Sequence, residues 1–213
     1  MKKAIIIGSE YMIEEIKSKL NNNINCDLSD YELKLLYAMD NDIDYQLFEY
    51  IVRRVNYYED CCKIFGSEHV ASTPSSITED TICYVGDLSI YKKLPTYNLK
   101  YIYGDLDYRL DKVYNLENLE LIIQDADFSD LISACGLESL QYIHESANFK
   151  SLISAEGLDN LQYIGRDIIF DSLLNGESLE NLQYIGRTAS FESLTSAKGL
   201  ENLGFIGQDK IIN

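Results

Sequence analysis

Residues 158–164 read Leu-Asp-Asn-Leu-Gln-Tyr-Ile, and close variants of this heptapeptide recur on both sides of it. The other copies begin at residues 116, 137, 179 and 200, so the spacing from one copy to the next is constant throughout. A second block keeps the same period: a phenylalanine at 128, 149, 170 and 191 is followed three residues later by a leucine. Five copies in register establish a repeat, and such a repeat builds its core by stacking each unit on the next.

The length of the period indicates which kind of repeat this is. Repeats made of helix pairs need about 33–34 residues, whereas a period of about 20 residues is too short for them. It suits one coil of a β-rich solenoid with short strands joined by turns. Within one coil, the residues assigned to the interior, with their equivalents in other coils, are Leu158, Leu161, Ile164, Ile168, Phe170 and Leu173.

Glycines recur where the coil is expected to turn, either before or after the leucine block. Such positions commonly require a positive φ or a close approach of two backbones. The glycines concerned are Gly136, Gly157 and Gly199 before the block, and Gly165, Gly186 and Gly207 after it.

The repeat pattern Leu-x-x-Leu-x-Tyr-Ile-Gly, followed by Phe-x-Ser-Leu-x-Ser-Ala-x-Gly, resembles the short leucine-rich repeats of bacterial proteins and the receptor L-domain solenoid. The resemblance covers residues 115–213 well and about 80–114 in degraded form. It implies binding through a repetitive face and implies no catalytic residues. The chain lacks the regular Leu-x-Leu-x-x-Asn step of ordinary leucine-rich repeats, and this argues against the horseshoe shape of those proteins.

Residues 1–80 are predicted to form an α/β or mostly helical cap on the solenoid of residues 81–213. A short strand is expected over residues 3–9, and helices over 10–20, after the capping box at 29–32, and over 45–58. Residues 67–80 are polar and predicted to be a loop. The expected fold class is therefore α/β, with a leucine-rich-repeat-like β-solenoid of roughly five to seven coils as its larger part.

The charge of the chain excludes some classes of partner. There are 35 acidic and 18 basic side chains, a formal net charge of −17, and residues 115–213 alone hold 16 acids and five bases. Phosphate backbones and anionic membranes attract Lys and Arg, so neither nucleic acid nor a membrane surface is an expected partner. The apolar run near the N-terminus is short and the five cysteines are odd in number, which favours a cytoplasmic protein with reduced thiols.

One acidic residue recurs in every coil, and we call this set the acidic ridge. Stacked coils would bring these carboxylates to about 4.8–5 Å from one another. The structural interpretation is a solvated turn that keeps a repetitive protein soluble, and the functional one is a ridge that binds a basic protein. The acidic ridge comprises Glu117, Glu138, Asp159, Glu180 and Glu201.

A second recurring set, the aromatic ladder, comprises Tyr142, Tyr163, Tyr184 and Phe205. If the neighbouring leucine and isoleucine point inward, these rings should lie at the surface and stack on one another. They would then serve an interface or stabilise the sheet by themselves. The recurring asparagines are better explained by hydrogen bonding at turns, and they are Asn118, Asn160, Asn181 and Asn202.

Other candidate sites are weaker. The strand–glycine–helix opening could place the Gly8 and Ser9 amides near a phosphate, but neither Gly-x-Gly-x-x-Gly nor a P-loop motif is present. Cys61, Cys62 and His69 lack the spacing of a metal site or of a thiol–imidazole pair, and His144 is expected to be exposed and inert. No catalytic, metal or cofactor site is expected.

The sequence therefore predicts a non-enzymatic module that binds a basic protein through the aromatic ladder and the acidic ridge, for example as an inhibitor or decoy. The alternatives are a nucleotide or small-ligand sensor built on residues 1–80, and an exported, adhesin-like repeat protein. Because the chain stops in mid-repeat after Lys210-Ile211-Ile212, a homodimer through the last coil is also expected.

Overall fold

The computed structural model describes residues 58–206 and 210–212, and the chain divides into two units, Met1–Ser67 and Glu68–Asn213. In the first unit the described element is helix α4 (Tyr58–Phe65). It ends at Gly66, whose φ of 88° is readily adopted only by glycine and whose amide donates to the Cys62 carbonyl over 3.0 Å. The strand and helices expected over residues 3–57 lie outside the described residues.

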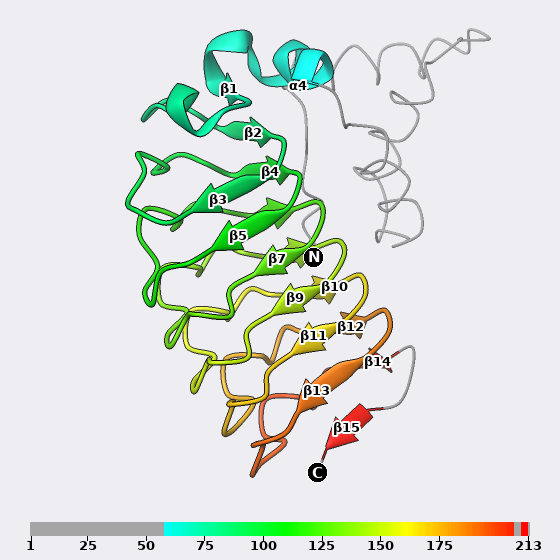
Figure 1. Cartoon of the computed structure of the whole chain (residues 1–213). Helices are drawn as coiled ribbons and strands as arrows, with labels where there is room; N and C mark the ends of the chain where they lie inside the picture. The colour runs from blue at the N-terminus through cyan, green and yellow to red at the C-terminus, as the bar shows by residue number, and fades with distance from the viewer. Residues whose placement is uncertain (1–57, 207–209, 213) are drawn as a thin grey trace, which may run out of the picture. The chain divides into compact units, whose positions relative to one another are not determined.

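The second unit is a β-solenoid with coils of about 20 residues and little helix (Figure 1). Val70 pairs with Cys83, Cys83 with Tyr101 and Tyr101 with Leu121, so the first steps along the solenoid are shorter than the later ones. Every later step keeps the constant spacing of the sequence repeat, as Tyr163 pairing with Tyr142 and with Tyr184 illustrates. The predicted β-rich solenoid, its period and its degraded first coils are confirmed.

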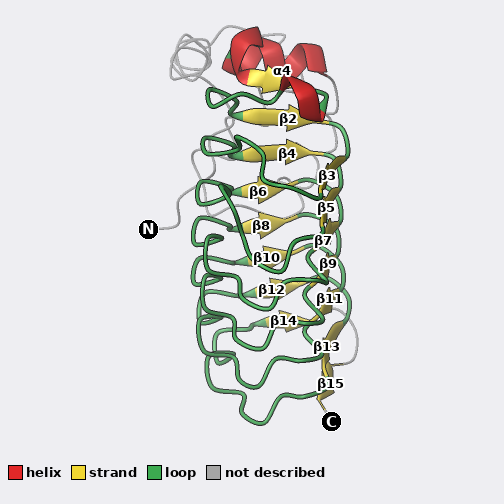
Figure 2. Cartoon of the chain, turned by 60° about the vertical axis from the view of Figure 1, so that its left-hand side comes forward, coloured by secondary structure: helices red, strands yellow, loops and turns green. Residues whose placement is uncertain are grey.

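From β2 onward, each coil contributes one strand to each of two parallel sheets, which Figure 2 shows as two stacks along the unit, and β1 extends the first sheet alone. The first, sheet A, contains β1 (Val70–Ala71), β2 (Cys83–Val85), β4 (Tyr101–Tyr103), β6 (Leu121–Ile122), β8 (Tyr142–Ile143), β10 (Tyr163–Ile164), β12 (Tyr184–Ile185) and β14 (Phe205–Ile206). The second, sheet B, contains β3 (Leu88–Ile90), β5 (Leu106–Tyr108), β7 (Ala126–Asp127), β9 (Ala147–Asn148), β11 (Ile168–Ile169), β13 (Ala189–Phe191) and β15 (Lys210–Ile212). Two short 3-10 helices, Ser67–His69 and Pro74–Ser76, flank β1.

The core lies inside the coils, between the two sheets and the turns that join them. All six residues predicted to be interior in the coil around residue 163 are buried, and so are their equivalents in the neighbouring coils. The phenylalanines stack from coil to coil, with ring centroids 4.9 Å apart for Phe128–Phe149, 5.4 Å for Phe149–Phe170 and 5.7 Å for Phe170–Phe191. No coil could bury these rings alone, so stacking holds the solenoid together.

The described glycines of both sets leave no room for a Cβ, and those of the first set also adopt a positive φ. Gly136, Gly157 and Gly199 have φ of 104°, 98° and 91°, and the equivalent residues Asn115 and Ser178 also have positive φ, so this turn is left-handed in five successive coils. At Gly165 and Gly186 the requirement is space, because an added Cβ would overlap a carbonyl oxygen of the preceding coil. The expectation at these five glycines is confirmed, and Gly207 lies outside the described residues.

The recurring asparagines link neighbouring coils at the turns, as expected. The Asn160 side-chain amide donates to the Glu138 carbonyl over 2.6 Å, and Asn181 donates to the Asp159 carbonyl over the same distance. Asn202 repeats the bond one coil later. These three asparagines thus hold the backbone of an acidic-ridge residue in the coil before them, and Asn118 holds Tyr97 in the same way.

Candidate functional site

The acidic ridge is exposed at all five of its positions. Three of its carboxylates also close the turn they stand on: Glu138 and Glu201 each accept the amide hydrogen of the glycine two residues earlier over 2.8 Å, and Asp159 does so over 3.2 Å. The structural interpretation of the ridge therefore has direct support. Each of these bonds engages one carboxylate oxygen, so the side chains keep acceptor capacity and charge for a partner.

A pocket of about 460 Å³ opens on the ridge. Four carboxylates from three successive coils surround it, so it is a strongly acidic concave feature. Its lining comprises Cys135, Glu138, Ser154, Glu156, Gly157, Asp159, Glu177 and Ser178. Two of these, Glu138 and Asp159, were candidates from the sequence, so the structure brings them together in one site.

The chain places one of its own cations at the edge of this pocket. The Lys198 ammonium contacts a Glu177 carboxylate oxygen at 2.7 Å. That hydrogen bond and the charge of Glu177, with further contributions from Glu180 and Glu201, raise the pKa of Lys198. The position equivalent to Lys198 is occupied by Glu177, Glu156 and Cys135 in the three preceding coils. Lys198 therefore illustrates how a lysine would interact with this row of acids.

Beside the pocket, three large aliphatic side chains are exposed to solvent at the same position of successive coils. We call Ile132, Ile153 and Leu174 the aliphatic strip, and their exposed fractions are 54%, 49% and 47%. Ser154, on the wall of the pocket, directly follows Ile153. The backbones are hydrogen-bonded from coil to coil here, as in the 3.3 Å bond from the Leu174 amide to the Ile153 carbonyl. The strip therefore lies on ordered, stacked backbone.

The aromatic ladder does not form the exposed surface that the sequence suggested. Tyr142 and Tyr163 are only 4% and 3% exposed and Tyr184 is half-buried, so the expectation is wrong for the first two rings. Their faces pack on one another: Tyr163 and Tyr184 are parallel at 4.8 Å between centroids, and Tyr142 and Tyr163 are tilted at 6.4 Å. The Phe205 side chain lies outside the described part of the chain.

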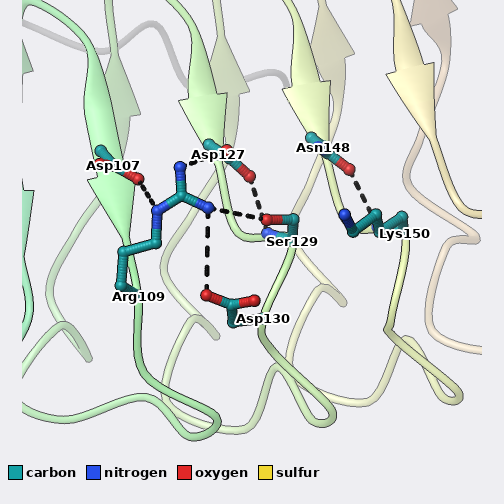
Figure 3. Close-up of polar contacts among 7 residues, drawn as sticks. All are labelled: Asp107, Arg109, Asp127, Ser129, Asp130, Asn148 and Lys150. Atoms are coloured by element: carbon teal, nitrogen blue, oxygen red, sulfur yellow. Dashed lines mark hydrogen bonds and ion pairs between the residues drawn. The ribbon is translucent and has the colours of Figure 1, made fainter.

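A second polar cluster lies on sheet B around Arg109 (Figure 3). Its guanidinium pairs with Asp107, with Asp127 at 3.0 Å and with Asp130 at 3.9 Å, and it donates to the Ser129 hydroxyl over 3.1 Å. These partners come from its own coil and the next one. Because the guanidinium is engaged within the chain, this cluster is a clamp between coils.

The remaining sequence candidates show no arrangement for chemistry. Cys61 is buried in α4, and a His69 ring nitrogen hydrogen-bonds with the Asp80 carbonyl at 2.9 Å. Within the described residues no group of three His, Cys, Asp or Glu side chains is placed to hold a metal ion. His144 was expected to be exposed, and this is wrong because only 3% of it is. Gly8 and Ser9 lie outside the described residues.

No helix in the described part of the chain is both long and apolar enough to cross a bilayer. Comparisons with models of known protein families, with curated proteins and with solved structures give no match for this chain. The class that the fold defines is accordingly a β-solenoid, without assignment to a particular family.

The sequence interpretation missed Glu156, Glu177 and the whole aliphatic strip. The signal was present, because both sets recur with the same period as the leucine block. The strip was overlooked because each of its members directly follows a buried leucine and so looks like part of the core. The two glutamates were overlooked because Cys135 and Lys198 interrupt their row.

Proposed function

We propose that this protein is a non-enzymatic binding module whose acidic ridge and pocket hold a basic segment of another protein. The proposal extends the resemblance to leucine-rich-repeat and L-domain solenoids, which implies binding through a repetitive face. The observation that carries it is the pocket itself, where Glu138, Glu156, Asp159 and Glu177 converge from three coils.

Electrostatics explain why such a site would bind. Like charges about 5 Å apart repel by roughly 1 kcal/mol per neighbouring pair in water, and bound cations relieve that repulsion. Lys198 already does so for Glu177, whereas the ion pairs of the described residues include none to Glu138, Glu156 or Asp159. Charge complementarity of this kind speeds association and selects partners, and it weakens as salt rises.

The aromatic ladder is not part of the proposed binding surface. With Tyr142 and Tyr163 so little exposed, the ladder serves to stabilise sheet A, and the acidic residues make the partner contacts. The protein would work in the cytoplasm, where the exposed free thiol of Cys135 stays reduced. An inhibitor or decoy that occupies the basic surface of a toxin or nucleic-acid-binding protein is one form such a module takes.

Charge reversal tests the proposal. In the full chain, Glu138, Asp159 and Glu180 are replaced by Lys, and binding of a labelled peptide of lysines spaced by serines is followed by fluorescence anisotropy. Three reversals at roughly 1 kcal/mol each should weaken binding at least about tenfold at low salt.

The matched control reverses Glu68, Glu79 and Asp80, which are exposed acids that belong to neither the acidic ridge nor the pocket. It has the same net charge as the ridge variant and should bind within about twofold of the wild type. Equal weakening in the two variants would show that only net charge matters, and it would overturn the proposal.

The homodimer and the nucleotide sensor stay predictions, each with its own test. The homodimer through the last coil is tested by light scattering at micromolar concentration, where a dimer is expected and a monomer contradicts it. The nucleotide sensor falls on residues outside the described part, and a thermal-shift screen with ATP, GTP and NAD tests it.

A further inference from the structure

Three half-exposed aliphatic side chains at one position of three successive coils are an unusual surface. Single exposed apolar residues are common and need no explanation, but contiguous ones indicate a contact site. Here Ile132, Ile153 and Leu174 line up along the stacking direction, while the same position is Asp111 in the coil before and Thr195 in the coil after. The aliphatic strip therefore has defined ends.

The spacing of the strip matches one secondary structure better than another. Stacked coils are about 4.8 Å apart, so the strip offers one apolar side chain every 4.8 Å or so. An α-helix lying along the stack presents residues at i, i+3 or i+4, and i+7 with axial steps of about 4.5–6 Å. A β-strand presents same-face residues about 6.6 Å apart and would lose register after one coil.

The charge beside the strip defines the polar side of such a helix. The acidic pocket begins at Ser154, next to Ile153, and holds Glu156 and Glu177 among its four carboxylates. On the other side of the strip, charge is mixed, with exposed Lys150 in one coil and exposed Glu192 two coils later. Cations are therefore favoured along one edge of the apolar stripe.

We propose that the partner of this site is a basic amphipathic α-helix, about two to three turns long, that lies along the stack. Its apolar residues at i, i+3 or i+4, and i+7 rest on the aliphatic strip, and its Lys or Arg side chains enter the acidic pocket. This is recognition of a helix by an apolar surface with charge complementarity. The inference rests on the proposed function and adds to it the class of partner.

Other occupants fit less well. A second copy of this chain docked face to face on this site would bring acidic ridge against acidic ridge, and each copy carries a net charge of −17. An anionic membrane surface is disfavoured for the same reason. An extended basic peptide satisfies the pocket but not the spacing of the strip, and this makes it the informative comparison in an experiment.

The experiment compares two synthetic peptides of identical composition, lysines and leucines, on the full chain. In one peptide the leucines fall at i, i+3, i+4 and i+7, and in the other they are scrambled so that no apolar stripe forms. The amphipathic peptide should bind at least about tenfold tighter, because the strip gains apolar burial only with it. Circular dichroism should show that this peptide gains helix on binding.

A strip variant with Ile132, Ile153 and Leu174 changed to Ser should bind both peptides equally, at the affinity of the scrambled one. The matched control changes Tyr91 and Tyr97 to Ser, since these are large exposed side chains away from the pocket, and it should keep the preference. Equal binding of both peptides to the wild type would overturn the helix proposal. If the ridge variant then failed to bind either peptide, the proposed function would stand without the helix. If the ridge variant bound both peptides as the wild type does, the helix proposal and the proposed function would both fail.

Discussion

Replacing Phe149 by Leu should destabilise the solenoid while leaving its surface unchanged. The Phe149 ring is fully buried and stacks on two others: its centroid is 4.9 Å from that of Phe128 at 10° and 5.4 Å from that of Phe170 at 18°. A stacked pair contributes about 0.5–1.5 kcal/mol beyond the burial of its area. Because leucine keeps most of the apolar burial, the loss of both pairs should lower the free energy of unfolding by about 1–3 kcal/mol.

The chain supplies its own comparison in Phe191, which is also fully buried but has one described aromatic neighbour, Phe170 at 5.7 Å. The Phe191→Leu change should therefore lower the free energy of unfolding by about half as much. Urea unfolding followed by circular dichroism measures both variants against the wild type. The reasoning would be refuted if Phe149→Leu were no more destabilising than Phe191→Leu, or if it changed stability by less than about 0.5 kcal/mol.

Three further changes test the links between coils. Asp105→Asn should raise the free energy of unfolding at pH 7 by less than about 1 kcal/mol, since solvent screens this partly exposed group. Burial and the charges of Asp87 and Asp125 raise the pKa of Asp105, and the hydrogen bond from the Asp125 amide opposes them. The gain should shrink as pH falls through the folded-state pKa, since protonation then removes the same penalty from the wild type, and a gain that did not depend on pH would contradict this. Gly165→Ala should lower the free energy of unfolding by more than about 2 kcal/mol, because the new Cβ would overlap a backbone carbonyl oxygen. Gly204→Ala should leave it nearly unchanged, because the nearest atom to that Cβ would be 3.8 Å away. Arg109→Met should lower the free energy of unfolding by about 1 kcal/mol in low salt and by less in high salt, because Arg109 pairs with three carboxylates. The control Lys150→Met should leave the free energy of unfolding nearly unchanged.

The architecture was predictable because residues one period apart occupy equivalent positions in successive coils. A strict, unbroken period fixes which side chains share a position, and the inward Leu, Ile and Phe residues then follow from their apolar character. The positive-φ turn was recognised where glycine marks it. It was missed at Asn115 and Ser178, because the backbone adopts a positive φ there although the residue is not glycine.

The site was only partly predictable, because exposure depends on neighbours in space. Strand alternation predicts that Tyr163 and the buried Ile164 point to opposite faces of the sheet. It does not predict how closely the ring of Tyr184 covers Tyr163. The two acidic-ridge residues Glu138 and Asp159 were found from the period alone. That their side chains line a pocket with Glu156 and Glu177 depends on the path of the turn, which the sequence pattern does not specify.

Methyl nuclear magnetic resonance shows which face of the solenoid a peptide contacts. The full chain, with labelled isoleucine and leucine methyl groups, is titrated with the amphipathic lysine–leucine peptide. We expect the methyl signals of Ile132, Ile153 and Leu174 to shift, while those of the buried Ile143 and Ile164 do not. Shifts confined to other methyl groups, or no shift at a peptide concentration that saturates the anisotropy signal, would contradict the assignment of this face as the binding site.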